Sequence, residues 1–299
     1  APYLKWERND QFNAGVDFGI LNGRIRLTAD WYSKLSKDIL LDLAQPTHMG
    51  FPSLLMNSGE IKNTGIEFTI SADPFTGKGF SWHTDVTLSH NKGTFNSIPT
   101  ANHRQQQAGS FQNQLFQMIE GEKLGTFWGY TFGGIWQEDE VNAPFVDANG
   151  QTNGKTNGEV YKVVAGNSKY VDTNKDGVLN DADQGIIGCG QPTFNWGWNN
   201  SFNYKNFDFS FFMVGFHGFD IYNATHQMGF NTVSGQNMAA VTPMRDFLNR
   251  WTPTNTNTDV PGFVQGGTEN KVFSSRFVEN GSFIKMKSIT LGYTLPELA

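Results

Sequence analysis

The feature that most limits how this chain can fold is an alternation of apolar and polar residues over strand-length segments. Every second residue is apolar in residues 12–18, FNAGVDF, and the pattern returns in residues 24–31, RIRLTADW, after Asn22-Gly23. A period of two places alternate side chains on opposite faces of a β-strand, and Asn-Gly favours a two-residue hairpin turn. Residues 12–31 therefore predict an antiparallel hairpin with one apolar and one polar face.

Further segments repeat this alternation and show unequal connections. Their apolar positions lie in residues 66–70 and 82–88, in 194–202 and 207–213, and in 289–293. The turns at 20–23, 73–79 and 205–206 are short, whereas the connections at 34–63, 91–124, 137–192 and 218–281 are long. Outer-membrane barrels combine short periplasmic turns with long outer loops in this way.

Two folds fit strands with a single apolar face. A soluble β-sandwich buries that face and leaves the other in water. A membrane barrel turns it to lipid and lines a watery interior with the polar face. The strand lengths approach the ~9–11 residues that cross a bilayer at a tilt, and Arg24, Arg26, Asp30 and Glu67 suit a wet interior. We therefore expect an all-β chain, an antiparallel section of a transmembrane β-barrel with long extracellular loops.

The direction of the strands leaves one segment open. Residues 80–90 should end on the outer side and residues 193–204 should start there, so an even number of crossings must lie between them. Residues 126–136 are the one convincing strand in that interval. Either this segment belongs to an extracellular loop, or a weaker partner strand lies near residues 159–171.

Composition agrees with a thin apolar surface better than with a large core. Only 38% of the residues are hydrophobic, yet 14% are aromatic. We expect outward aromatics near strand ends at the membrane interfaces, among them Trp31, Tyr32, Trp82 and Tyr293. A net charge of −6 without a basic run argues against a nucleic-acid partner. The single Cys189 excludes an internal disulfide.

Residues 172–183, DTNKDGVLNDAD, match the spacing of a calcium-binding loop. That loop takes oxygen ligands at positions 1, 3 and 5, a glycine at 6, a carbonyl at 7 and a carboxylate at 12. The predicted ligands are the side chains of Asp172, Asn174 and Asp176, the carbonyl of Val178 and the carboxylate of Asp183. Asp183 is shorter than the usual Glu and closes the site less well, and no flanking helices are evident. The alternative is a metal-free outer loop rich in Asp and Asn.

Catalytic motifs are weak by comparison. The sequence contains no Ser-His-Asp order, phosphate-binding loop or Cys/His cluster. Glu67 and Asp85 fall on facing strands of one hairpin, as the paired carboxylates of a glycosidase would, but a polar barrel interior carries such groups without acid–base chemistry. We predict no enzyme activity. Loop aromatics are candidates for stacking on sugar rings, for contacting a surface partner or for packing their own loops: Phe111, Phe116, Trp251 and Phe263.

Several of these segments together resemble one known family. The matching segments are residues 4–7, 12–18, 57–67, 125–130, 134–136, 172–183, 207–210, 250–253 and 281–293. In this order they are similar to the SusC/RagA family of TonB-dependent outer-membrane transporters of Bacteroidetes. The resemblance implies a plugged barrel of about 22 strands. It also implies a SusD-like surface lipoprotein as partner, and energy supplied by TonB acting on the plug.

The resemblance extends over the whole chain. The sequence begins at Ala1 without Met or a signal sequence, and it stops soon after a strand-like segment. We therefore expect residues 1–299 to form a partial outer-membrane β-barrel domain. The plug, the first barrel strands and the last strand are expected to lie outside it, and TonB would act through the missing N-terminal part.

Three classes of function remain on the sequence alone. The first is a component of a TonB-dependent outer-membrane importer that takes up oligosaccharides or peptides with a SusD-like lipoprotein, in contact with outer-membrane lipid. The second is a passive porin or adhesin barrel. The third is a soluble carbohydrate-binding β-protein. The possible calcium ion is the one cofactor that the sequence suggests.

Overall fold

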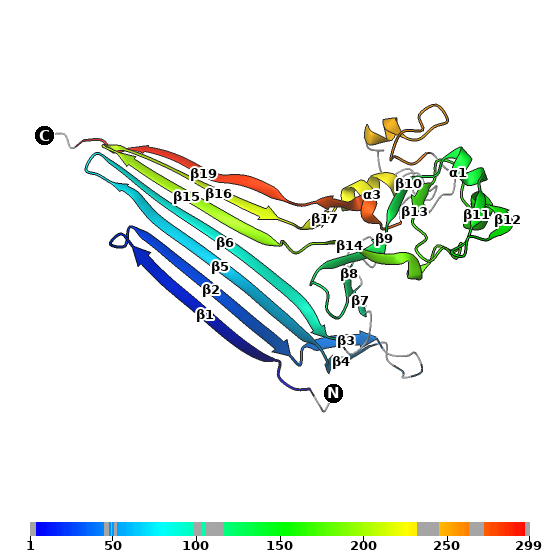
Figure 1. Ribbon diagram of the computed structural model, residues 1–299, viewed down its shortest axis with the longest axis horizontal. Helices are drawn as coiled ribbons and strands as arrows, with labels where there is room; N and C mark the ends of the chain where they lie inside the picture. The colour runs from blue at the N-terminus through cyan, green and yellow to red at the C-terminus, as the bar shows by residue number, and fades with distance from the viewer. Residues whose placement is uncertain are drawn as a thin grey trace.

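The computed structural model describes residues 4–44, 48, 50, 53–98, 103–105, 116–231, 245–262 and 272–296. These residues form a long antiparallel sheet and, at one end of it, a folded body built from the connections between strands (Figure 1). Within the described part of the chain, no helix has the length and apolar character needed to cross a membrane.

The main sheet has seven strands that follow one another in space as they do along the chain. They are β1 (Arg8–Ile20), β2 (Ile25–Lys37), β5 (Glu60–Thr76), β6 (Phe80–Ser97), β15 (Phe194–Tyr204), β16 (Phe207–His217) and β19 (Phe283–Tyr293). All neighbouring pairs are antiparallel. The predicted all-β, antiparallel fold is confirmed.

The three short turns lie together at the end of the sheet opposite the folded body (Figure 1). In the first of them Leu21, Asn22 and Gly23 all have positive φ values of 52°, 57° and 82°. Asn and Gly tolerate this left-handed conformation best, which explains why the Asn-Gly pair marks the turn. The predicted hairpin of residues 12–31 is confirmed.

The strand register sorts side chains onto two faces. Directly paired residues point to the same side of an antiparallel sheet. One row crosses five strands as Ala29, Phe68, Leu88, Trp196 and Gly215. A Cβ at Gly215 would lie 2.3 Å from the Trp196 indole nitrogen, so this glycine makes room for the neighbouring ring.

The next row along the strands faces the other way and is mostly polar. It runs as Thr28, Thr69, Thr87, Gly197 and Val214. Each of these residues is the sequence neighbour of a residue in the apolar row, and neighbours along a strand point to opposite faces. The alternation of faces therefore continues across the sheet and not only within single hairpins.

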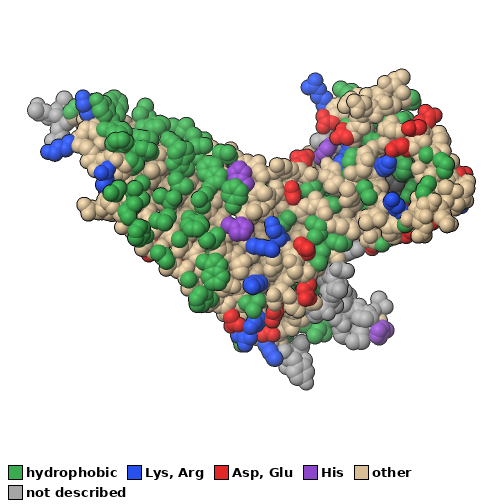
Figure 2. Space-filling view, viewed as in Figure 1, with side chains coloured by type: hydrophobic (Ala, Val, Ile, Leu, Met, Phe, Trp, Pro, Cys, Tyr) green, Lys and Arg blue, Asp and Glu red, His purple; other side chains and the backbone are tan. Residues whose placement is uncertain are grey.

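The apolar face is open. Leu27 on β2 is 37% exposed and Leu291 on β19 is 72% exposed, and neither Phe68 nor Trp196 is buried. Figure 2 shows hydrophobic side chains gathered over the long sheet, whereas charged side chains are more frequent on the folded body and at the edges. A sandwich would seal this face against a second sheet, so the soluble-sandwich alternative does not fit the described residues.

Aromatic residues lie near the turn end of the apolar face. Phe207 and Tyr293 pair there, with their ring centroids 4.6 Å apart, and Trp82 stacks on Phe202 at 5.8 Å. One predicted interface aromatic is wrong. Tyr32 directly follows the outward Trp31 and so points to the polar face, where its hydroxyl donates to Asn91 Oδ1 at 3.1 Å.

Residues 126–136 do not cross with the main sheet. β6 pairs directly with β15, while β9 (Thr126–Tyr130) and β10 (Phe132–Ile135) belong to small sheets in the folded body. The weaker strand expected near 159–171 exists as β13 (Ser168–Tyr170), and it pairs with β10 in that body. Both segments are therefore part of the connection, and the parity of the strand directions is kept without extra crossings.

We call the described residues of 98–193 and 218–282 the loop module. Its remaining strands are β7 (His103–Gln105), β8 (Phe116–Met118), β11 (Pro144–Val146), β12 (Thr152–Thr156), β14 (Gln184–Cys189), β17 (Asp220–Tyr222) and β18 (Val278–Asn280). Its helices are α1 (Glu138–Asn142), α2 (Asn157–Tyr161), α3 (Ala224–Asn231) and the 3-10 turns Asp181–Asp183, Arg245–Asn249 and Ser275–Phe277. A separate hairpin pairs β3 (Leu40–Ala44) with β4 (Ser53–Asn57).

The dry core of the described chain lies in and beside the loop module. Phe127 packs with Phe273, and Val260 with Phe277, which has no exposed surface. Hydrogen bonds join the module's two segments as well, for example from the Gly262 amide to the Gly166 carbonyl at 2.8 Å. Two connections far apart in sequence thus form one packed unit, beside the end of the sheet opposite the three short turns.

Candidate functional site

The polar face of the sheet is the first candidate surface. On β2, β5 and β6 it carries Asp30 opposite Glu67, and Glu67 opposite Ser89. Asp85 lies opposite Ser71, so Glu67 and Asp85 occupy different rows and form no carboxylate pair. The surface presents charges and hydroxyl groups in rows, an arrangement suited to contact with water and with a polar solute.

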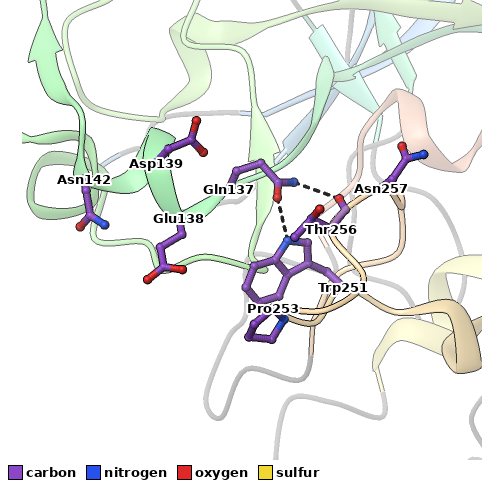
Figure 3. Close-up of a pocket in the computed structure, with 8 residues that line it drawn as sticks. All are labelled: Gln137, Glu138, Asp139, Asn142, Trp251, Pro253, Thr256 and Asn257. Carbon is purple, nitrogen blue, oxygen red and sulfur yellow. Dashed lines mark hydrogen bonds between the residues drawn. The ribbon is translucent and has the colours of Figure 1, made fainter.

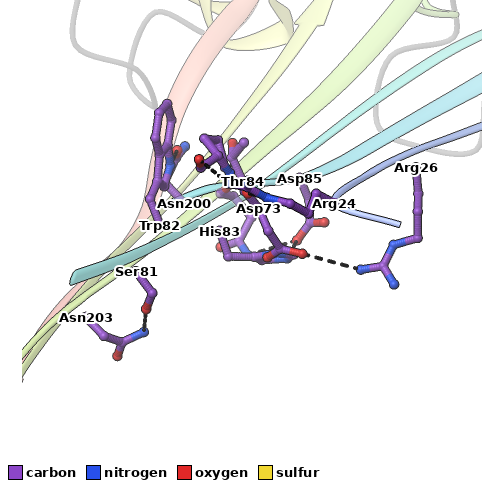
Figure 4. A network of polar contacts seen from close by, with 12 residues as sticks. Arg24, Arg26, Asp73, Ser81, Trp82, His83, Thr84, Asp85, Asn200 and Asn203 are labelled. Atoms are coloured by element: carbon purple, nitrogen blue, oxygen red, sulfur yellow. Dashed lines mark hydrogen bonds and ion pairs between the residues drawn. The ribbon is translucent and has the colours of Figure 1, made fainter. Parts of the chain in front are cut away.

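A network of charged groups ties three strands together on this face (Figure 4). His83 lies between two carboxylates, with Nδ1 2.7 Å from Asp73 Oδ1 and Nε2 3.0 Å from Asp85 Oδ2. Arg26 reaches Asp73 at 3.9 Å, and the Arg24 side chain donates to the Asp73 carbonyl at 3.1 Å. The His83 ring therefore bridges neighbouring carboxylates on the polar face.

The polar face becomes partly apolar on β16. Phe212, Val214 and Phe216 point inward there, and Phe216 stacks on Phe283 at 5.3 Å. The sequence pattern did not reveal this patch, because outward Phe211 and Met213 make residues 211–214 a continuous apolar run. Such a run cannot assign faces until a neighbouring strand fixes them.

The apolar face holds one polar cluster that the alternation also concealed. Asn200 is 1% exposed, and its Oδ1 accepts a hydrogen bond from the Trp82 indole at 3.0 Å (Figure 4). The Trp198 indole donates to Thr84 Oγ1, also at 3.0 Å. An indole N–H without a partner is costly in hydrocarbon. These two polar residues therefore allow tryptophan on a lipid-compatible surface.

The predicted calcium loop lies in the loop module, directly after β13. Asp172 accepts hydrogen bonds from the amides of Lys175 and Gly177 at 2.6 and 2.9 Å, and from the Tyr161 hydroxyl at 2.8 Å. Burial, together with this hydrogen bond, raises the pKa of Tyr161 above its ordinary value. Asp183 is buried and accepts from the Thr173 amide at 2.9 Å.

The other predicted ligands are engaged in the same manner. Asn174 Oδ1 accepts from the Asp176 amide at 3.0 Å, Asp176 Oδ1 from the Val178 amide at 2.8 Å, and the Val178 carbonyl from Asn180 Nδ2 at 3.1 Å. Among the described residues, no group of three or more His, Cys, Asp or Glu side chains is placed to hold a metal ion. The ligand oxygens thus serve the loop's own turns, and calcium binding stays a prediction.

An antiparallel sheet with an open apolar face, a charged opposite face and a packed module at one end is the wall of a transmembrane β-barrel. A family model described as TonB dependent receptor-like, beta-barrel, matches residues 1–148. The TonB-dependent receptor P3 of Formosa agariphila is 33% identical over 98% of this chain. TonB-dependent receptor SusC of Bacteroides thetaiotaomicron is 27% identical over 99% of it.

The chain belongs to the TonB-dependent receptors and is SusC-like. It spans 28% of the length of the P3 receptor and 27% of SusC. Among solved structures, the RagAB peptide importer in its 'open-open' state superimposes with a TM-score of 0.74 at 20% identity, over 99% of this chain and 29% of that one. This structural likeness independently supports the barrel fold.

Proposed function

We propose that this chain forms part of the wall and outer loops of an importer in the outer membrane, which takes up oligosaccharides or peptides. The observation that carries the proposal is the register of the main sheet. It places Phe68, Leu88 and Trp196 on one face and Thr69 and Thr87 on the other. A wall with lipid on one side and water on the other needs this separation.

The relatives support transport in preference to catalysis. TonB-dependent receptors are transporters as a family, and the RagAB structures are described as those of a peptide transporter. By analogy with SusC and RagAB, we propose a SusD-like lipoprotein as the surface partner and TonB as the source of energy. The folded loop module, at the outer end of the sheet, is the part of this chain available to such a partner.

Uptake by a strain that lacks the gene tests the proposal. We expect the deletion to abolish growth on one class of nutrient, either an oligosaccharide or a peptide mixture, when that class is the sole carbon source. Deleting tonB should give the same defect, and a tagged receptor should co-purify with a lipoprotein. Uptake that persists without TonB would favour the passive porin or adhesin, and recovery in the soluble fraction would favour the soluble carbohydrate-binding protein.

Calcium binding by residues 172–183 is a separate proposal, supported by the ligand spacing. Calorimetric titration of the full-length receptor with calcium should show one saturable site that Asp176→Ala removes. Asp176 is the informative position because it is exposed, whereas Asp172 also holds Tyr161 and two amides. Asp147→Ala, which removes an Asx turn elsewhere in the module, is the matched control. Absence of binding heat from the unmodified receptor would refute the site.

A further inference from the structure

An open groove of about 830 Å³ lies where the two segments of the loop module meet (Figure 3). One side is lined by Gln137 and by Glu138, Asp139 and Asn142 of α1, and the other by Trp251, Pro253, Thr256 and Asn257. Its volume is within the ~300–1,000 Å³ typical of small-molecule sites. Neither the charged network of the sheet nor the 172–183 loop contributes to it.

The indole of Trp251 is held in one orientation at this groove. Its Nε1 donates to Gln137 Oε1 at 2.9 Å, and Gln137 Nε2 donates onward to the Ile135 carbonyl at 3.0 Å. A Cβ at Gly166 would come within 2.7 Å of the Trp251 ring, so the ring packs directly against glycine backbone. Because its N–H group is already bonded, the indole offers the groove ring carbon surface.

Polar side chains complete the lining. Glu138, Asp139 and Asn142 project from α1, and Asn257 lies across the groove (Figure 3). All four residues are exposed. The carboxylates accept hydrogen bonds, whereas the two amides both donate and accept them. Donors and acceptors side by side match hydroxyl groups, each of which also does both.

The charge of the groove lining narrows the class of ligand further. No Lys or Arg is among the residues that line the groove. The nearby Lys169 ammonium is 2.7 Å from Glu140 Oε1 and lies 4.7 Å from the centre of the Trp136 ring. Although burial opposes ionisation of Glu140, its hydrogen bonds with Lys169 and the Gln137 amide hold its pKa below the ordinary value. The groove therefore repels anions such as acidic glycans.

We propose that this groove is a binding subsite for a neutral oligosaccharide, with Trp251 as the platform on which one sugar ring packs. The inference rests on the importer function proposed above and names its substrate class. The flat apolar face of a sugar ring suits an aromatic surface, while its hydroxyl groups at the rim suit carboxylates and amides.

Binding of defined probes to the full-length receptor tests this assignment. The probes are the neutral hexasaccharides maltohexaose, laminarihexaose and xylohexaose, an acidic hexagalacturonate and a lysine-containing hexapeptide, each measured by calorimetry. We expect at least one neutral hexasaccharide to bind, and Trp251→Ala to weaken it about tenfold or more. Trp251→Tyr, which keeps a ring, should retain most of the affinity.

Trp251 also packs within the module, so its loss can disturb folding as well as binding. Two variants of exposed groove residues separate these effects. Glu138→Gln and Asn142→Ala change exposed side chains and should each weaken the hexasaccharide roughly three- to tenfold. Glu120→Gln, an exposed carboxylate of the module outside the groove, is the matched control and should bind normally. Resistance of each variant to limited proteolysis confirms that the module is folded.

The possible failures are distinct. TonB-dependent uptake that is normal in Trp251→Ala and Glu138→Gln, with unchanged affinity, would overturn the subsite and leave the importer standing. Binding of the hexapeptide or hexagalacturonate but of no neutral hexasaccharide would also overturn it. If the importer function itself were wrong, uptake would not depend on this gene or on TonB.

Discussion

Leu88→Arg in the full-length receptor will prevent stable assembly in the outer membrane, whereas Thr87→Arg will be tolerated. Leu88 is 41% exposed on the apolar face, between Phe68 and Trp196. An arginine on the lipid face of a barrel costs about 2–4 kcal/mol near the bilayer midplane. Thr87 is the adjacent residue and faces the polar side, where a charged head can stay in water.

The measurement is the amount of receptor in purified outer membranes, together with the urea concentration at which it unfolds. The pair of variants introduces the same charge one residue apart, so differences in expression or charge do not explain a difference between them. Equal destabilisation by both would mean that the two faces are not lipid and water, and the barrel assignment of this sheet would fail.

Phe277→Ala will loosen the loop module while the sheet persists. Phe277 has no exposed surface and packs with Val260 and with the partly buried Tyr222 and Phe247. Removing a buried phenylalanine side chain in this way costs about 3–5 kcal/mol, through lost burial and the cavity that remains. The main sheet should be preserved because its strand pairs do not depend on this cluster.

Limited proteolysis of whole cells reports the stability of the module, and heat resistance of the folded barrel on gels reports that of the wall. Leu248→Ala is the matched control, because Leu248 is 80% exposed and such surface changes usually stay within about 0.5 kcal/mol. If Phe277→Ala leaves cleavage at the control rate, the 218–282 segment of the module does not pack around Phe277 in the membrane.

The sequence predicted the main sheet well because each strand repeats one physical rule. Alternation decides which side chains share a face, and Asn22-Gly23 places the first turn, so the hairpin of β1 and β2 follows from the residues alone. The prediction for Tyr32 was wrong because it followed the residue type, an aromatic near a strand end, although the alternation places position 32 on the polar face. At residues 211–214 the alternation placed Phe211 and Met213 on the apolar face, but it did not reveal that Phe212 and Val214 make the opposite face apolar as well.

The loop module could not be predicted to the same degree. Strands such as β10 and β13 have four and three residues, too few for a periodic pattern to define them. Their pairing depends on packing between residues far apart in sequence, such as Phe127 with Phe273. The groove at Trp251 arises from packing between the two segments of the module. The sequence therefore indicated Trp251 as a candidate contact residue but did not indicate the groove. The acidic loop was recognised from its spacing, but its internal hydrogen bonds were not.

The direct pairing of β6 with β15 across residues 98–193 has a thermodynamic consequence. The entropy lost on closing a loop grows only with the logarithm of its length, so closing about a hundred residues costs roughly 2 kcal/mol more than closing ten. Insertions at this point therefore lower the stability of the membrane wall only slightly. The outer surface of such a receptor is free to lengthen, shorten or exchange whole segments over evolution while the strands beneath keep their partners, which makes this junction a natural place to graft foreign recognition elements.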